Sequence, residues 1–474
     1  MTWLDDIPRV RLFGIMDVGE TFMKTIRKAL EEVNSKIKVR AAMPGHKGRL
    51  VLSSHNDVTE LPGVDNLHHP TGVIEAAEKR AAEIYGVRSA RYLVNGSSSG
   101  NLTMIFSFFQ EGEEILVERT CHKSVYNALV LRKLRPVYLW PKLDAYGSTL
   151  PVTAEAVLAA LDSHPGIQGV FLTQPSYKGL VSDLEAIHAA CRKKGATLLI
   201  DAAHGAGLAG MADFKEFYAS CDAMVVSAHK SLACLNQGAV LLNNRPELSA
   251  RLMKYSNMFQ TTSPSYLIMS SIEESLEELA EGRYLKGPDI RLDAFDNLIL
   301  DPVGSIYRKD PWKLLAVCRG QGAFMDSFLE DRGIYAEFHD EHSVLFMLSP
   351  GNRPEELRLI EEVLAELDQA VAGRAPEGGA ASGLAMPPAP EAVLQPNEVG
   401  EDYEEVALEA SAGRIAWEQV TPYPPGVPLL LPGEKIDQAM VEHLAGLERM
   451  DIEIIGIHEG SLRCLKGGDG PWGY

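Results

Sequence analysis

Four polar segments carry the residue types that could do chemistry, and each of them follows a short apolar run. They are residues 95–101 (NGSSSGN), 119–127 (RTCHKSVYN), 201–207 (DAAHGAG) and 227–230 (SAHK). Apolar runs of this length are typical of buried strands. Because ligands in open α/β sheets bind beyond the carboxyl ends of the strands, we expect the four segments to meet at one edge of a sheet.

Lys230 is the candidate nucleophile. It comes just after the apolar run AMVV at 223–226. A lysine in that place can direct its amine into a cleft, where apolar surroundings lower its pKa and allow attack on an aldehyde. Ser227 and His229 flank it and could donate hydrogen bonds to a phosphate. A single lysine usually lies on the solvated surface, so its neighbours carry this interpretation.

Asp201 and His122 are the candidates for binding the ring of pyridoxal phosphate. Asp201 ends the apolar run ATLLI, and a carboxylate there needs a partner such as a pyridinium N–H. An ionised aspartate would keep that ring nitrogen protonated and make the ring an electron sink. Asp201 could equally cap the following turn. His122 could stack on the ring, although a single histidine is more often a packed or surface residue.

Three consecutive serines are the candidates for binding the phosphate. Ser97, Ser98 and Ser99 lie between an expected strand and an expected helix. Hydroxyls and free N–H groups at a helix start suit a phosphate dianion, although a serine-rich cap without a ligand would have the same sequence. The order of phosphate loop, stacking residue, acid and lysine resembles that of fold type I pyridoxal-phosphate enzymes.

The elements that must position these residues alternate between strand and helix. Such alternation predicts an α/β fold, with a mainly parallel sheet that is covered on both faces. We expect a large cofactor-binding domain, a smaller α+β domain and two outlying segments. The large domain is expected over 41–310 and the smaller domain over 311–474. The two outlying segments are an N-terminal helical segment at 1–40 and a flexible, low-complexity insert at 373–399. The strands of the sheet are expected at 91–94, 114–117, 136–140, 169–173, 196–200, 223–226 and 238–242.

Composition limits the class of protein. The 474 residues carry a formal net charge of −20, which argues against nucleic acid or an anionic membrane as partner. No apolar run is long enough to span a membrane. The six cysteines show neither paired nor metal-ligand spacing, and no secretory signal is present. We therefore expect a cytoplasmic protein with reduced thiols and no metal.

Several longer motifs resemble one family, the bacterial ornithine/lysine/arginine decarboxylases. The resemblance extends over most of the chain, from about residue 10 to 465, and the chain is similar to the short forms, which include biosynthetic arginine decarboxylases. No receiver-like wing domain precedes the first motif, so we do not expect a ring-shaped higher assembly, although assembly beyond a dimer stays open. The motifs are MPGHKG (43–48), NGSSSGN (95–101), CHKSVYNAL (121–129), TQPSYKGL (173–180), DAAHGAG (201–207), SAHKSL (227–232), TTSPSY (261–266) and YPPGVPLLLPGE (423–434).

The resemblance assigns roles to individual residues. It implies that pyridoxal phosphate is bound covalently to Lys230, and that Lys230 or His229 returns a proton to the substrate. It also implies a homodimer with shared sites, because Thr262 matches a position that reaches the phosphate of the neighbouring subunit. The remaining roles are stacking for His122, pairing with the ring nitrogen for Asp201, proximity to the cofactor for His204, and phosphate binding for Ser98, Ser99, Ser227 and His229.

The expected reaction is decarboxylation of a basic amino acid, with L-arginine giving agmatine for polyamine biosynthesis. Lysine and ornithine stay open as substrates. Glu434 and Glu418 are candidates for binding the distal cation, and either could instead be a solvated surface acid. An aminotransferase, a β-eliminating lyase or an aldolase is a further possibility, although no arginine is identifiable as a substrate-carboxylate ligand. A non-catalytic binding protein is disfavoured by the intact Lys230 and Asp201.

Overall fold

The computed structural model describes residues 33–50, 54–291, 295–303, 306–374, 389–423, 426–449 and 452–467. Most of the helical segment expected over 1–40 therefore lies outside the described residues, and so does the greater part of the insert expected at 373–399. Among the described residues, no helix combines the length and the apolar character that crossing a membrane requires.

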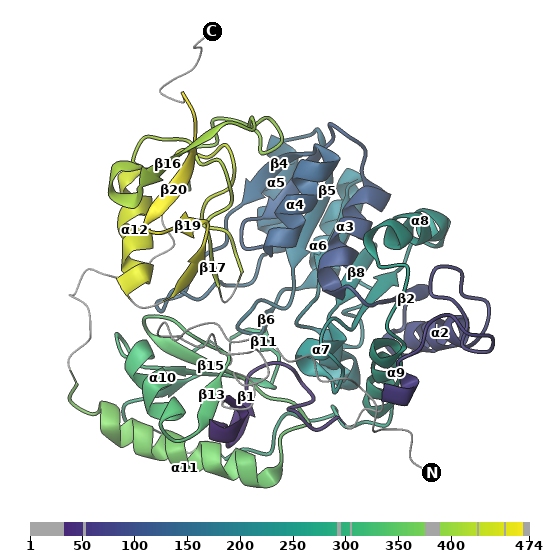
Figure 1. The fold of residues 1–474 in the computed structure, drawn as a ribbon, viewed down its shortest axis with the longest axis horizontal. Helices are drawn as coiled ribbons and strands as arrows, with labels where there is room; N and C mark the ends of the chain where they lie inside the picture. The colour runs from purple at the N-terminus through teal and green to yellow at the C-terminus, as the bar shows by residue number, and fades with distance from the viewer. Residues whose placement is uncertain are drawn as a thin grey trace, which may run out of the picture.

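A seven-stranded sheet forms the centre of the molecule (Figure 1). Only β9 runs antiparallel to its neighbours, β2 and β8, while the other adjacent pairs are parallel. Every residue of β8 and β9 is buried, as expected for strands covered on both faces. The expected mainly parallel sheet is thus confirmed. Its order is β2 (Ser89–Leu93), β9 (Ala239–Asn243), β8 (Ala223–Val226), β7 (Thr197–Asp201), β5 (Ile167–Thr173), β3 (Glu114–Glu118) and β4 (Arg135–Leu139).

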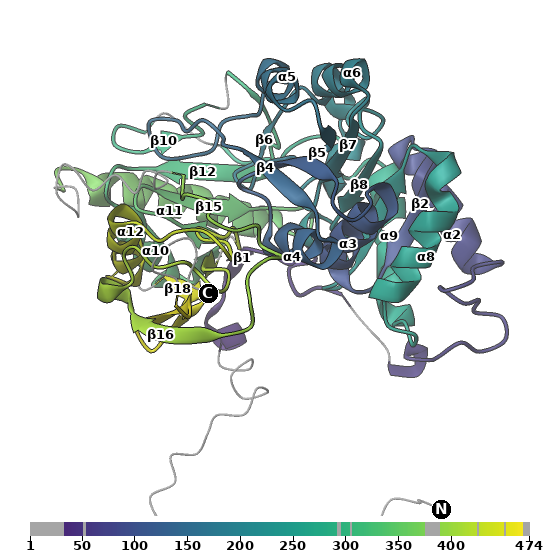
Figure 2. The same cartoon turned by 90° about the horizontal axis from the view of Figure 1, so that it is seen from above.

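Helices cover both faces of this sheet (Figure 2). Because successive side chains of a strand point to opposite faces, Leu199 packs into one core while Leu198 and Ile200 pack into the other. One core includes α3 (Gly96–Phe108), α4 (Lys123–Arg132) and α8 (Ser249–Phe259). The other includes α2 (Val73–Tyr85), α5 (Ala154–Ser163), α6 (Leu184–Lys194) and α9 (Tyr266–Ala280).

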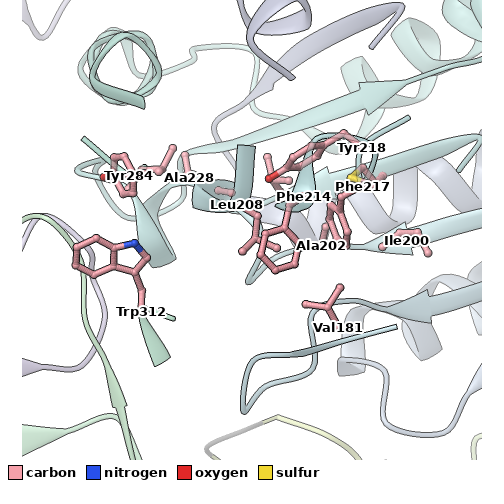
Figure 3. Close-up of a cluster of buried hydrophobic side chains, with 14 of the residues drawn as sticks. Val181, Ile200, Ala202, Leu208, Phe214, Phe217, Tyr218, Ala228, Tyr284 and Trp312 are labelled. Carbon is pink, nitrogen blue, oxygen red and sulfur yellow. The ribbon is translucent and has the colours of Figure 1, made fainter. Parts of the chain in front are cut away.

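An aromatic cluster supports the chain just after β7 (Figure 3). The 3-10 turns η2 (Ala206–Gly210) and η3 (Ala212–Phe214) follow the strand, and the ring centroids of Phe217 and Tyr218 lie 5.0 Å apart. The hydroxyl of Tyr218 donates to the carbonyl of Gly205. Tyr284 and Trp312 extend the cluster, with their centroids 6.2 Å apart. This packing fixes the loop that carries His204.

A second, four-stranded antiparallel sheet follows in the chain and packs into the same core as the large sheet. Near it, the N-terminal strand β1 (Val39–Ala41) pairs with β13 (Ile334–Ala336), so the MPGHKG segment lies between the two sheets. The four strands of the second sheet are β10 (Ile299–Leu300), β12 (Lys313–Val317), β15 (Ser343–Met347) and β14 (Phe338–His339). The helices in this part of the chain are α10 (Gly322–Glu330) and α11 (Pro354–Val371). A separate pair of short strands is formed by β6 (Leu180–Val181) and β11 (Arg308–Lys309).

The C-terminal residues form a third unit with a hydrophobic core of its own, drawn in yellow in Figure 1. The region expected as one domain over 311–474 contains this unit together with three of the four strands of the second sheet, β12, β14 and β15. The third unit contains β16 (Tyr403–Ala407), β20 (Ser461–Leu465), β19 (Ile457–His458), β17 (Thr421–Tyr423), β18 (Glu453–Ile455) and α12 (Gln438–Arg449). Three further 3-10 turns are η1 (Ser54–Asn56), η4 (Pro246–Leu248) and η5 (Leu408–Ala410).

Candidate active site

A cavity of about 650 Å³ lies beyond the carboxyl ends of β3, β5 and β7. All three sheet-based units contribute side chains to its wall. The structure thus brings together most of the polar residues that the sequence singled out, as the shared strand ends predicted. Those in the wall are Ser97, Ser98, His122, Asp201, His204, His229 and Lys230; residues from the two smaller units include Glu337, Phe338, Asp340, Tyr423, Val427 and Leu429.

Lys230 lies on a single helical turn, α7 (Ala228–Ser231), directly after β8. Its Nζ lies 3.1 Å from Nε2 of His204. Burial lowers the pKa of the Lys230 amine, although the charges of Asp201 and Glu337 act in the opposite direction. Burial also holds the pKa of His204 well below its ordinary value, so this imidazole is neutral. A lysine with a lowered pKa beside a neutral base is suited to nucleophilic attack on an aldehyde.

Asp201 is the last residue of β7 and is buried. Its Oδ2 accepts a hydrogen bond of 2.8 Å from Nδ2 of Asn101, and its Oδ1 accepts one of 3.0 Å from the backbone N–H of Ala203. Burial raises the pKa of the Asp201 carboxyl. Both hydrogen-bond donors are neutral, so a protonated ring nitrogen would supply the positive partner that a buried carboxylate requires. The site therefore fits a pyridinium ring.

His122 presents a neutral ring to the cavity. It is the N-cap of α4, where its Nδ1 accepts a hydrogen bond of 3.2 Å from the backbone N–H of Ser124. Burial, followed by the charge of Lys230, lowers the pKa of His122 to about 3. Gly426 approaches this ring so closely that an added Cβ would lie 3.3 Å from Cδ2 of His122. The ring is thus fixed in orientation, as a stacking role requires.

The start of α3 and the turn after β8 meet at the expected phosphate site. The Ser227 hydroxyl donates to Oγ of Ser97 over 2.8 Å, and Ser98 also lines the cavity. No side chain of the described residues caps the start of α3, and the first turn of this helix contains no acidic residue, so the helix end is open to an anion. Ser99 differs from the expectation, because its hydroxyl is buried and donates to the carbonyl of Gly96 within the helix.

The MPGHKG segment supports the turn that carries Lys230. The backbone N–H of Gly45 donates to the carbonyl of His229 over 2.9 Å. A Cβ at position 45 would lie 2.3 Å from the carbonyl oxygen of Leu232, so only glycine allows this approach. His229 is itself fixed on the other side, because its Nδ1 lies 3.0 Å from the carbonyl oxygen of Gly238. Burial lowers the pKa of His229 to about 4.

Three residues that the sequence analysis did not single out also line the cavity. The Tyr177 ring meets the His204 ring edge-on, with centroids 5.0 Å apart, and its hydroxyl donates to Oε1 of Glu337 over 2.8 Å. Glu118 is fully buried and accepts from the backbone N–H of Thr173. Tyr177 belongs to the motif TQPSYKGL, but the motif does not indicate a role for this tyrosine. The residues around Glu337 in the sequence do not indicate a functional role for it, because the residues that it contacts are distant in the chain.

Glu434 and Glu418, the two candidates for binding the distal cation of the substrate, do not line this cavity. Glu434 is buried and forms an ion pair with Arg119, whose Nη2 lies 3.1 Å from Oε2. Glu418 instead lies 2.8 Å from Nε2 of His458 and 3.5 Å from Nη1 of Arg463. Each carboxylate is therefore occupied by a cationic or ionisable partner of its own chain.

Arg119 connects the large sheet to the C-terminal unit. It is fully buried, and its guanidinium donates to the carbonyl oxygens of Pro428 and Leu429 over 2.6 and 3.1 Å, as well as to Glu434. Leu429 belongs to the cavity wall. The ion pair therefore holds in place the C-terminal segment that covers the cavity.

Thr262 is exposed and does not line the cavity of its own chain. It lies in the loop that precedes α9. The preceding residue, Thr261, donates its backbone N–H to Oδ1 of Asn95 over 3.3 Å, which brings this loop beside the start of α3. The expected contact between Thr262 and a second subunit stays a prediction.

Comparison with known proteins gives matches to two family models. The Orn/Lys/Arg decarboxylase major domain matches residues 28–286, and the Orn/Lys/Arg decarboxylase C-terminal domain matches residues 384–459. The protein YaaO of Bacillus subtilis is 34% identical over 84% of this chain and 87% of its own length. An arginine decarboxylase of Halalkalibacterium halodurans is 30% identical over 86% and 88%, respectively. The fold is similar to that of lysine decarboxylase A from Pseudomonas aeruginosa, with a TM-score of 0.72 at 21% identity over 87% of this chain and 74% of that one.

Proposed function

Because the chain belongs to the Orn/Lys/Arg decarboxylase family, and is thus a pyridoxal-phosphate-dependent amino-acid decarboxylase, we propose that its substrate is L-arginine and its product agmatine. The observation that carries the chemistry is the meeting of Lys230, His204 and Asp201 in one cavity. Similarity to a protein named as an arginine decarboxylase over most of both chains supports the choice of arginine. We further propose that the enzyme acts in the cytoplasm, in polyamine biosynthesis.

Pyridoxal phosphate, when bound, supplies the electron sink into which the electrons of the Cα–carboxylate bond pass. The residues of the chain bind and orient it. Ser97, Ser98, Ser227 and the start of α3 would hold the phosphate, and Asp201 would keep the ring nitrogen protonated. His122 would lie against the ring. The hydrogen bonds that Asn101 and Ala203 donate hold the Asp201 carboxylate in one orientation, so that little reorganisation is needed during the reaction.

Lys230 and His204 form the proton-transfer pair of the proposed mechanism. The 3.1 Å separation of Nζ and Nε2 allows a proton to pass directly between them. Since the pKa of His204 is lowered by burial, the imidazole gives up a proton readily and does not retain it. We propose that Lys230 delivers the proton that replaces the carboxylate at Cα. His229 has a weaker claim, because its Nδ1 is already engaged with the carbonyl of Gly238.

The C-terminal unit contributes to the exclusion of water. Tyr423, Val427 and Leu429 form part of the cavity wall, and Arg119 anchors this segment from inside the large domain. A dry cavity strengthens the electrostatic contacts to developing charge and prevents unwanted protonation. The buried ion pair of Arg119 and Glu434 therefore supports catalysis through position, without contact to the reacting atoms.

We expect the purified enzyme to convert L-arginine with a higher kcat/KM than L-lysine or L-ornithine. A guanidinium offers a planar pair of donors that a carboxylate can bind through two hydrogen bonds, which an ammonium cannot match. The measurement is the release of agmatine, cadaverine and putrescine from the three amino acids at equal enzyme concentration. A preference for lysine or ornithine would overturn the choice of arginine, whereas no amine from any of the three would overturn decarboxylation.

We also propose a homodimer whose subunits share their active sites through Thr262. When Thr262→Ala subunits are mixed with Lys230→Ala subunits, each heterodimer would hold one site with both lesions and one site with neither. Activity should therefore recover to roughly half that of the wild-type dimer per heterodimer. The measurement is activity after subunit exchange that is proven by differently tagged subunits. Absence of recovery in exchanged dimers would place both residues in the site of one subunit.

A further inference from the structure

Glu337 is held in the cavity wall by two neutral donors. It lies between β13 and β14 of the second sheet. Its Oε1 accepts from the hydroxyl of Tyr177 over 2.8 Å, and its Oε2 accepts from the backbone N–H of Met43 over 2.8 Å. Neither donor neutralises a negative charge. The carboxylate is therefore fixed in place by contacts that leave its charge available to a cation in the cavity.

The other acids of the cavity wall are already engaged. Asp201 faces the expected ring nitrogen. Asp340 forms an ion pair with Lys178 over 2.6 Å. Glu118 is fully buried, and burial raises its pKa to about 7, so a large part of it is uncharged near neutral pH. Among the described residues that line this cavity, Glu337 is thus the acid that is partly exposed and has no cationic side chain within 4.0 Å of its carboxylate.

We propose that Glu337 binds the distal cation of the substrate side chain, an inference that rests on the proposed decarboxylation of a basic amino acid. A positive group entering the cavity would meet this carboxylate in an orientation that Tyr177 and Met43 have already fixed. Preorganisation of this kind lowers the entropic cost of binding. Glu337 also takes the place for which the sequence had suggested Glu434.

Aromatic side chains beside Glu337 complete a site for a chain of methylenes that ends in a cation. The rings of Tyr177 and Phe338 meet edge-on with centroids 5.9 Å apart, and both residues line the cavity. Their faces can pack against methylenes and attract a guanidinium or an ammonium. The charge of Glu337 also acts on the pKa of Lys230, so the carboxylate is within electrostatic reach of the amine at which the reaction takes place.

The test compares two amines that differ only in the distal group. Agmatine ends in a guanidinium, and N-carbamoylputrescine is its neutral urea isostere. Neither can be decarboxylated, so their dissociation constants can be measured on the cofactor-loaded enzyme from the change in its visible spectrum. Wild-type enzyme should prefer agmatine by roughly 10- to 150-fold, as expected for one charge-assisted contact, and Glu337→Gln should reduce the preference to within a few-fold.

Asp368→Asn is the control, because Asp368 is an acid on α11 beside the second sheet, accepts from the backbone N–H of Leu298 over 2.8 Å and lies outside the cavity wall. It should lower thermal stability and leave the preference for agmatine intact. An unchanged preference in Glu337→Gln would overturn the role of Glu337 alone. A wild-type enzyme that discriminates neither this pair nor cadaverine from hexylamine would instead count against a basic substrate, and thus against the proposed function as well.

Tyr177→Phe provides a second measurement if Glu337→Gln loses its cofactor. Removal of the hydroxyl leaves the charge of Glu337 in place but deletes one of the two contacts that orient it. Agmatine should then bind several-fold more weakly, while N-carbamoylputrescine should bind nearly as before. Equal weakening of both amines would mean that Tyr177 and Glu337 only shape the cavity, and would contradict the proposal.

Discussion

Lys230→Ala should abolish amine production and remove the visible absorbance of the bound cofactor. Lys230 lines the cavity with its Nζ 3.1 Å from Nε2 of His204, and burial lowers the pKa of its amine, which favours the reactive uncharged form. Without it, the covalent bond to the cofactor cannot form and the proposed proton donor is lost. The expected loss is several orders of magnitude in kcat, measured as agmatine release, together with loss of the absorbance.

Lys254→Ala is a suitable control for this variant. Lys254 lies on α8 and is exposed, so its removal should change neither the spectrum nor the rate. If the Lys230→Ala protein is folded and still decarboxylates at close to the wild-type rate, the assignment of Lys230 is wrong.

Asp201→Asn should retain the fold and the cofactor but lower kcat by orders of magnitude. The asparagine has nearly the same shape, and its single side-chain oxygen can still accept the hydrogen bond from the backbone N–H of Ala203. Its amide nitrogen would then face Asn101, whose own side-chain amide can turn to present its oxygen. The asparagine cannot supply the negative charge that stabilises a protonated ring nitrogen. The ring is then a weaker electron sink for the charge that develops during decarboxylation, and the rate falls. The measurement is single-turnover decarboxylation, with the visible spectrum recorded to establish the amount of bound cofactor.

Asp222→Asn is the matched control for this second prediction. Asp222 is a buried acid that precedes β8 at the opposite edge of the same sheet, where it accepts from the backbone N–H of Leu198 over 2.8 Å. Its replacement should lower stability without a specific loss in the decarboxylation step. If the rate of Asp201→Asn lies within a few-fold of the wild-type rate, Asp201 is only a structural cap, and the cofactor ring does not bind against it.

The sequence predicted the strands and strand-end residues because their signals are local. The expected strand at 223–226 coincides with β8, and that at 196–200 is offset from β7 (Thr197–Asp201) by one residue. Strands buried on both faces are nearly continuous apolar runs, and the polar residue that ends each run is visible in the sequence. The assembly of Asp201, His122 and Lys230 then follows from the parallel order of the strands.

Contacts between distant parts of the chain could not be predicted in this way. The pairing of β1 with β13 joins residues nearly 300 positions apart, and it is this pairing that brings Met43 to Glu337. The engagement of Glu434 by Arg119 depends on a similar long-range contact, so a motif that contained the acid could not show which cation it meets. The sequence also does not show on which side of the first helical turn the hydroxyl of Ser99 lies, so its hydrogen bond to the carbonyl of Gly96 could not be predicted.

The most direct test of the role of Lys230 is chemical. Borohydride reduces the C=N bond between a lysine and pyridoxal phosphate and leaves the cofactor attached to that lysine through a stable amine. Proteolysis and mass spectrometry then identify the labelled residue. The expected result is a single pyridoxyl label on Lys230. A label on Lys47 or Lys313, two buried lysines whose pKa values burial lowers to about 7, would contradict the assignment, and so would the absence of any label from protein that retains its visible absorbance.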